Sequence, residues 1–307
     1  MSDDLRDSLD SYISFQLAEL EGCLPLIALS DQEAVHDARL ALRRIRSVFS
    51  CYKPLLPHVP REAIKDLRWL ARSLGEARDE YVLAQRITQW LDSSGAWRSP
   101  RPLFDAVETL RSSSGRIAAG LGTRRRAAKS IQSVRTALLA GAGEAGTQEE
   151  VLELLQWQWL MVQRSLKSVA KVQHEAERDE LLHRLRKDIK RLRYCVEAVS
   201  DILGPAATAI IQPAIRMQRI LGEQHDSVTA KAWIQGLKGT PGINRLDVQE
   251  LLHMEHRRLK GTESEFRSAM EHNPLPEPRN ISREPLDNPV TSRHMSRNDT
   301  SMTGTTE

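Results

Sequence analysis

The stretch HDARLALRRIR, residues 36–46, decides the fold, because it has the pattern of an amphipathic helix and recurs later in the chain. Its cations follow one another at spacings of three, four and three residues: His36, Arg39, Arg43 and Arg46. At about 100° per residue, these four occupy one sector of about 80° on a helix. The apolar Leu42 and Ile45 lie to one side of that sector. The spacing therefore predicts a helix with a cationic stripe along the edge of its buried face.

A shift of 147 residues aligns this stretch with a second copy without a gap. It places His36 on His183 and Arg39 on Arg186, and LGE at 74–76 on LGE at 221–223. Eleven of the 44 aligned pairs between 36–79 and 183–226 are identical. The second stripe consists of His183, Arg186, Lys190 and Arg193, with Lys187 on its far side. This repetition predicts a duplicated helical unit.

Helical periodicity dominates the chain and alternating strand-like runs are nearly absent, so we expect an all-α fold. Segments rich in proline or glycine separate the helices, among them KPLLPHVP at 53–60 and GAGEAG at 141–146. The expected helices are 4–28, 31–52, 61–74, 78–93, 103–140, 149–174, 178–202, 206–221, 225–237 and 243–271, with a break near SSSGR or GLG inside 103–140. The sequence after Asn273 is rich in Pro, Asn, Ser and Thr, and its composition predicts disorder.

Composition excludes several classes of protein. The apolar share of 40% and the charged share of 28% are those of a soluble globular protein, and the net charge of +3 by itself indicates no partner. Cys23, Cys51 and Cys195 are far apart and form no CxxC, which argues against a disulfide framework or a zinc site and suits a reducing cytosol. No apolar run is long enough to span a membrane, and MSDDLRDSLD is too acidic for a signal peptide.

The stripes point to an anionic ligand. A solvated helix face usually mixes charges of both signs, but neither stripe contains an acid. Like charges one turn apart destabilise a helix by a few tenths of a kcal/mol per pair, and a bound anion would neutralise them. The alternative, a solvated basic face without function, stays open. His253 and His256 have the spacing of metal ligands, but no further ligand is evident, so we expect no metal and no cofactor.

The motifs LGEARD and LGEQHD place a glycine where we expect a helix to end and an aspartate shortly after it. Asp79 and Asp226 could therefore be N-caps of the next helices, or could orient an arginine of the stripe. A catalytic acid is the least favoured reading of either residue.

The segments VHDARLALRRIRS, LHRLRKDIKRLRYCVE, LGEARD and LGEQHD resemble the CHAD family, the conserved-histidine α-helical domain, over about residues 5–272. The resemblance implies two four-helix bundles related by pseudo-twofold symmetry, with residues 1–145 as the first half, 146–272 as the second and 273–307 as a disordered tail. It further implies that basic helix faces line a central groove or channel that binds inorganic polyphosphate. The residues implied for binding are His36, Arg39, Arg43, Arg46, Arg72, His183, Arg186, Lys187, Lys190, Arg193 and Arg219. The two halves need not contribute equally, because Lys65 aligns with Gln212 and Arg78 with His225.

Family members often follow a triphosphate-tunnel (CYTH) domain, whose strands have an ExExK motif. Here ESEFR at 263–267 lies in an expected helix, so the chain resembles a stand-alone member without that catalytic module, and we expect no enzymatic activity. Alternatives are a nucleic-acid or other polyanion binder, a polyphosphate-processing or phosphorelay enzyme, and a helical interaction scaffold. The expected location is the cytoplasm, with polyphosphate granules as one candidate place and no membrane partner.

Overall fold

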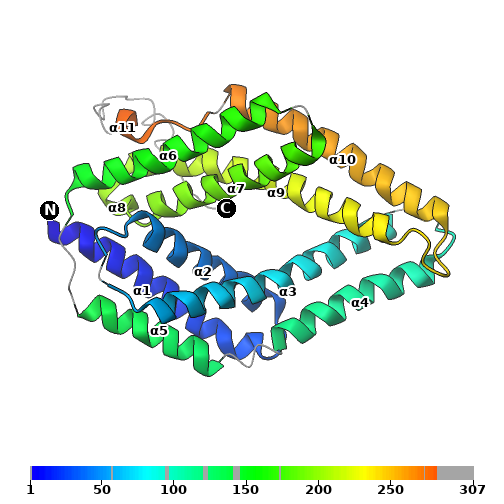
Figure 1. The fold of residues 1–307 in the computed structure, drawn as a ribbon, viewed down its shortest axis with the longest axis horizontal. Helices are drawn as coiled ribbons and strands as arrows, with labels where there is room; N and C mark the ends of the chain where they lie inside the picture. The colour runs from blue at the N-terminus through cyan, green and yellow to red at the C-terminus, as the bar shows by residue number, and fades with distance from the viewer. Residues whose placement is uncertain are drawn as a thin grey trace, which may run out of the picture.

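The structure, a computed structural model, describes residues 2–56, 58–93, 97–119, 124–140, 146–172, 174–272 and 274–281. Within these ranges the ordered elements are helices and no strand occurs, which confirms the all-α prediction. The helices, shown in Figure 1, are α1 (Ser2–Ile27), α2 (Gln32–Cys51), α3 (Arg61–Ser93), α4 (Pro100–Ala119), α5 (Arg124–Leu139), α6 (Gln148–Lys171), α7 (Glu175–Glu197), α8 (Ser200–Leu203), α9 (Pro205–Gly236), α10 (Arg245–His272) and α11 (Pro278–Ile281).

The helices correspond in pairs across the 147-residue shift. It aligns α1 with α6, α2 with α7, α3 with α9 and α4 with α10. The packing partners repeat as well, because α1 packs on α2 as α6 packs on α7, and α3 packs on α4 as α9 packs on α10. In Figure 1, α4 and α5 lie along the lower edge, α6 and α10 along the upper edge, and α2 and α7 between them.

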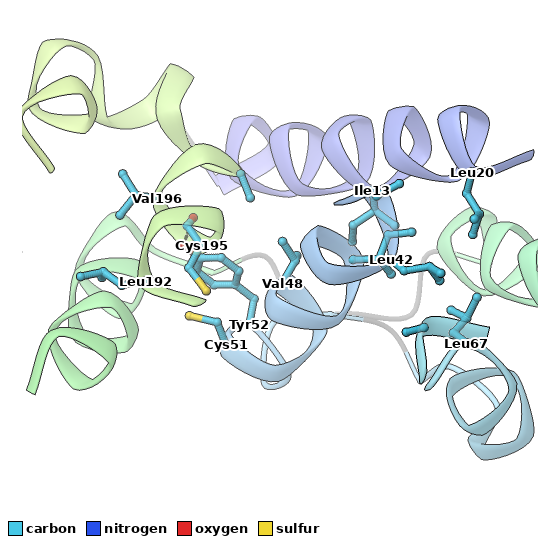
Figure 2. Packing of buried hydrophobic residues seen from close by; sticks show 14 of the residues in the cluster. Ile13, Leu20, Leu42, Val48, Cys51, Tyr52, Leu67, Leu192, Cys195 and Val196 are labelled. Carbon is cyan, nitrogen blue, oxygen red and sulfur yellow. Dashed lines mark hydrogen bonds between the residues drawn. The ribbon is translucent and has the colours of Figure 1, made fainter. Parts of the chain in front are cut away.

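The largest hydrophobic core joins the two stripe helices. Leu42 and Ile45 of α2 and Ile189 and Leu192 of α7 are fully buried in one cluster, as their positions beside the stripes predict. Near the α2–α7 contact, the Tyr52 hydroxyl is buried and donates a hydrogen bond of 2.8 Å to the carbonyl oxygen of residue 195 (Figure 2). The core thus fixes α2 against α7 and sets the distance between their stripes.

A second hydrophobic core lies where the ends of α3 and α9 pack on α4 and α10. Beside it, the buried carboxylate of Asp247 on α10 accepts hydrogen bonds from the backbone N–H of Ser99, at 2.7 Å, and from that of Arg98, at 3.1 Å. These donors precede the first turn of α4, so α10 anchors the start of α4.

A compensated charge network joins α3, α9 and α10. The Arg86 guanidinium donates from Nε and Nη2 to the two carboxylate oxygens of Glu255, at 2.8 Å each, and from Nη1 to Glu223 at 3.3 Å. Arg258 donates to Glu223 at 2.8 Å, and the Trp90 indole N–H donates to Glu255 at 2.6 Å. The Glu255 side chain is 0% exposed, so all of its charge is balanced within the protein.

Two predicted helix ends are wrong. The predicted helices 61–74 and 78–93 form the single helix α3, and the predicted helices 206–221 and 225–237 form most of the single helix α9. Gly75 and Gly222 therefore lie inside helices, and Asp79 and Asp226 cannot be N-caps. A glycine inside a helix costs about 1 kcal/mol relative to alanine, but it keeps its backbone hydrogen bonds, so glycine alone does not end a helix.

Other predicted boundaries fare better. The predicted break inside 103–140 is confirmed, because α4 ends at Ala119 and α5 begins at Arg124; residues 120–123 lie outside the described ranges. The predicted helix 178–202 divides into α7 and the short α8. The proline-rich segment at 53–60 separates α2 from α3 as expected, although residue 57 is not described. Most of GAGEAG, residues 141–145, also lies outside the described ranges.

The first residues of the expected disordered tail are packed. The carbonyl oxygen of Leu275 accepts a hydrogen bond of 3.2 Å from the Trp159 indole, and Gln156 donates to Glu277 at 2.6 Å. The Leu275 side chain is buried and α11 follows it, so residues 274–281 differ from the predicted disorder. Residues 282–307 lie outside the described ranges.

The cysteines are free thiols, and all three are buried. None of the described helices combines the length and the hydropathy that a membrane span requires.

Candidate functional site

The stripe of α2 lies against α3 through Arg39, which contacts Gly75 and Asp79. Arg39 Nη1 donates to the carbonyl oxygen of Gly75 at 3.3 Å and to Asp79 Oδ1 at 2.8 Å. A Cβ on Gly75 would stand 3.9 Å from the guanidinium, an ordinary contact, so Arg39 lies directly on the surface of α3. Asp79 thus orients an arginine of the stripe, which confirms one of the two roles considered for it.

The second half repeats this arrangement with one difference. Arg186 of α7 lies over Gly222 of α9, where a Cβ would stand 3.5 Å from its Nη2. Its Nε is buried and has no hydrogen-bond partner among the described residues. Burial raises the pKa of Asp226, the counterpart of Asp79, although the charge of Arg186 opposes that rise. The second arginine is therefore less compensated than the first.

The two stripes meet in what we call the central cluster. Its members come from α2, α3, α7 and α9: His36, Arg39, Arg43, Arg78, His183, Arg186, Lys190 and His225. Burial, followed by the charges of Arg186, Arg43 and Arg39, lowers the pKa of Lys190 to about 6. Burial and the charge of Arg39 lower the pKa of Arg43 to about 10, and Arg186 acts in the same direction. Cations of both halves thus disfavour one another's charge.

The cluster contains histidines from both halves. The His183 and His225 rings lie 4.4 Å apart between centroids, tilted by 33°. Burial lowers the pKa of each ring to about 4, and cations nearby add to the effect. In the first half, burial and the charge of Arg78 lower the pKa of His36. Arg78 also donates to the carbonyl oxygen of Gln32 at 3.4 Å, which holds it at the start of α2.

The remaining predicted site residues fall into two groups. Arg46, Arg72 and Lys187 are exposed, and none has an ion pair within the described ranges. Arg193 instead donates to Glu197 at 2.6 Å and to Gln218 at 3.0 Å, and Arg219 donates to Glu265 at 3.1 Å. The stripe pattern itself contains no acid, but nearby glutamates pair with Arg193 and Arg219, and the pattern did not predict these partners.

Sequence reasoning missed two members of the central cluster. Arg78 and His225 were noted only as a mismatch between the halves, yet both face the stripe histidines. A signal for them was available, because they follow Gly75 and Gly222 by three residues and so lie on the same helix face as those glycines. A hollow of about 450 Å³ opens elsewhere, beside Tyr12, Arg44 and Glu197.

The described residues hold no group of three or more His, Cys, Asp or Glu side chains that could bind a metal ion. His253 and His256 are exposed on α10. The chemistry that the central cluster offers is therefore that of guanidinium, ammonium and imidazole donors, which suits oxyanions.

Comparison with known families identifies the class of protein. A model described as the CHAD domain matches residues 11–235, well over half of the chain, so the protein belongs to the CHAD family. Two curated relatives are the uncharacterized proteins MT2285 and Rv2226 of Mycobacterium tuberculosis, each 29% identical over 221 residues. The match covers 65% of this chain and 39% of each relative, so the chain spans about two fifths of their length.

Solved structures agree on the fold. The crystal structure of the CHAD domain from the plant Ricinus communis matches with a TM-score of 0.66 and 21% identity, covering 89% of this chain and 93% of that one. PptA from Streptomyces chartreusis matches with a TM-score of 0.66 and 16% identity, covering 87% and 99%. At these identities the likeness concerns the fold alone.

Proposed function

We propose that the protein binds inorganic polyphosphate through the central cluster. The observation on which this rests is that Arg43, Arg186 and Lys190, from both halves, crowd together at the α2–α7 contact. None of the three has an ion pair within the described ranges, and Asp79 and Asp226 are the acids nearby. Desolvated cations without partners are costly, and an anion that enters the cluster lowers that cost. With a pKa of about 6, Lys190 is largely uncharged at pH 7 in the free protein, and a bound anion favours its charged form. Arginine offers forked donors to phosphate oxygens, and lysine offers a mobile point charge.

The arrangement suits a long polyanion better than a single phosphate. Each half presents one cationic stripe, so a flexible chain can contact both at once, and many weak contacts on one chain combine through multivalency. We propose a duplicated fold in which two four-helix bundles, 1–145 and 146–272, related by pseudo-twofold symmetry, line a shared groove. Binding should weaken steeply with salt, because the polymer releases counterions, by analogy with DNA.

Nucleic acid is the alternative that one observation disfavours. Proteins that hold single strands stack bases on exposed aromatic rings. Tyr194, the aromatic residue closest to the stripes in sequence, is only 3% exposed, and Arg193 lies over its ring at 5.5 Å. The ring is therefore not free to stack on a base. Competition among DNA, RNA and long polyphosphate at equal phosphate concentration separates the two functions.

We further propose that binding occurs without turnover. The histidines of the cluster lie among cations, and this suits the holding of an anion more than the transfer of a phosphoryl group. Incubation with polyphosphate should release no phosphate and leave no phosphohistidine; either product would make the protein an enzyme. Cytoplasmic location and association with polyphosphate granules stay predictions.

The test of the proposal is a titration with polyphosphates of several lengths at several salt concentrations. The variant Arg39→Glu/Arg43→Glu/Arg186→Glu/Lys190→Glu should retain its helicity and lose binding. A control, Arg164→Glu/Lys167→Glu/Lys171→Glu, reverses three charges on the exposed face of α6 and should still bind. Unchanged retention of polyphosphate by the folded cluster variant would refute the site.

A further inference from the structure

Beyond the central cluster, the two halves differ in how they treat their outer cations. A group of four arginines extends the α2 stripe in the first half, and we call it the lateral cluster: Arg46, Arg68, Arg72 and Arg191. Three of them, Arg46, Arg68 and Arg72, are exposed and have no ion pair within the described ranges. Arg191 has one loose contact, at 3.8 Å, with Asp188 one turn before it.

Packing of α2 on α3 brings these side chains together. Arg39 lies against Gly75 and Asp79, and the two helices run in opposite directions. Arg46, two turns farther along α2, therefore lies against Arg68, about two turns nearer the start of α3 than Gly75. The lowered pKa of Arg46 agrees, because after burial its causes are the charges of Arg68, Arg191 and Arg72.

The fourth arginine comes from the other half. The Cys195 thiol of α7 donates to the carbonyl oxygen of Ser47 at 3.6 Å, so the end of α7 lies beside the end of α2. Arg191 precedes Cys195 by about one turn and thereby lies next to Arg46. The lateral cluster is thus a meeting point of α2, α3 and α7, one turn beyond Arg43 of the central cluster.

The corresponding positions of the other half are neutralised. The 147-residue shift aligns Arg46, Arg68 and Arg72 with Arg193, Ile215 and Arg219, and Arg191 with Arg44. Arg193 pairs with Glu197 at 2.6 Å, and Arg44 approaches the same carboxylate at 3.4 Å. Arg219 pairs with Glu265 at 3.1 Å, and Ile215 has no charge. The lateral cluster is therefore left uncompensated, whereas the corresponding arginines have the acidic partners Glu197 and Glu265.

We propose that the lateral cluster is a second anion-binding subsite, which continues the central cluster on the first-half side only. This inference rests on the proposed function, because it assigns a direction to the bound polyphosphate. The bound polyphosphate leaves the central cluster over α2 and α3, and it is not held beside Glu197 and Glu265. Arg46 lies ten residues of α2 beyond His36, about 15 Å at the rise of an α-helix, so a ligand that spans both subsites from end to end is a linear chain of several phosphates.

The experiment compares counterpart arginines in the full chain. Arg72→Gln should weaken binding of long-chain polyphosphate more than Arg219→Gln, since only Arg219 has an acidic partner in the free protein. The double variant Arg68→Gln/Arg72→Gln should lower affinity by about tenfold or more, at about 1.4 kcal/mol per factor of ten. It should also make the slope of log K against log salt shallower by roughly 0.7 per lost contact, the value for single-stranded polyanions.

Two controls separate the possible outcomes. Arg164→Gln/Lys167→Gln on α6 removes the same charge elsewhere and should leave the slope unchanged. Tripolyphosphate, too short to span both subsites from His36 to Arg72, should lose less affinity in the double variant than long-chain polyphosphate does. Equal losses for Arg72→Gln and Arg219→Gln, or an unchanged slope in the folded double variant, would overturn the inference while polyphosphate binding stands. A wild-type protein that holds no polyphosphate would overturn the proposed function itself.

Discussion

Two groups of charged side chains adjoin α3 and α9, and the protein compensates only one of them. The network around Arg86 joins these helices to α10, and the central cluster joins them to α2 and α7. In the network around Arg86, every charge has a partner: Glu255 and Glu223 face Arg86, and Arg258 faces Glu223. In the central cluster, Arg43, Arg186 and Lys190 face one another, and Asp79 and Asp226 are the nearby acids. The chain can evidently place carboxylates between these helices where the fold requires them.

The difference teaches which charges serve the fold. The desolvation cost of a buried ion pair is offset when the contact geometry is good. The bidentate contact of Arg86 with Glu255 has that geometry. An uncompensated cluster has no such gain and lowers stability through desolvation and repulsion. We therefore assign the first group to stability and the second to a ligand, and each prediction below tests this division.

The largest expected effect is on the compensated side. Glu255→Ala leaves Arg86 buried without its bidentate partner and should lower the free energy of unfolding by about 3–5 kcal/mol, as measured with denaturant. Glu265→Ala, which removes the acid of an exposed pair with Arg219, should cost less than about 1 kcal/mol. Similar losses for the two variants would erase the distinction between the groups.

Lowering the pH should reduce the stability of the protein through the central cluster. The pKa of His225 is lowered from 6.5 to about 4 in the folded protein, so between these values the unfolded chain binds a proton that the folded chain does not. The contribution of His225 to stability is thus present above pH 6.5 and is lost as the pH falls towards about 4. Its neighbours there are Arg186, Lys190, Arg39, Asp79 and the His183 ring.

His225→Gln should therefore show a smaller loss of stability between pH 6.5 and 4 than the wild type, in thermal or denaturant unfolding at each pH. Bound polyphosphate should also reduce the loss of stability of the wild type between pH 6.5 and 4, because an anion favours the charged imidazole. Parallel pH profiles for the two proteins would contradict the burial of an uncompensated histidine.

The glycines beneath the arginines offer a smaller effect. Gly222→Ala places a Cβ 3.5 Å from Arg186, an ordinary contact, and removes the conformational freedom of a glycine inside α9. It should raise the free energy of unfolding by about 0.5–1 kcal/mol and leave polyphosphate affinity nearly unchanged. A marked loss of affinity would instead show that Arg186 needs a glycine beneath it to reach the ligand.

The smallest effect concerns the acid at Arg39. Asp79 is 61% exposed, so its pair with Arg39 contributes little to stability, about 0.2–1 kcal/mol. Asp79→Asn should free Arg39 for an anion and raise polyphosphate affinity by up to about fivefold at low salt, with the gain fading at high salt. Weaker binding would show that Asp79 positions Arg39 for the ligand and does not compete with it.

Local pattern predicted the helices and the stripes, because periodicity fixes which side of α2 and α7 is buried and the repeat fixes which residues correspond. It did not predict the continuity of α3 and α9. Gly75 and Gly222 lie inside these helices, where Arg39 and Arg186 from neighbouring helices pack over them, and those contacts are not local in sequence. Nor could it foresee that Glu265, on α10, would neutralise Arg219, or that Arg68 and Arg191 would meet beside Arg46.

The most direct test replaces the unpaired basic side chains of Arg43, Arg186 and Lys190 with apolar residues of similar length. The folded variant Arg43→Met/Arg186→Met/Lys190→Met should be more stable than the wild type by about 1 kcal/mol or more in denaturant unfolding at pH 7. In the same preparation it should no longer bind long-chain polyphosphate. A variant that is less stable and still binds would contradict the account, because these cations would then serve the fold and not a ligand.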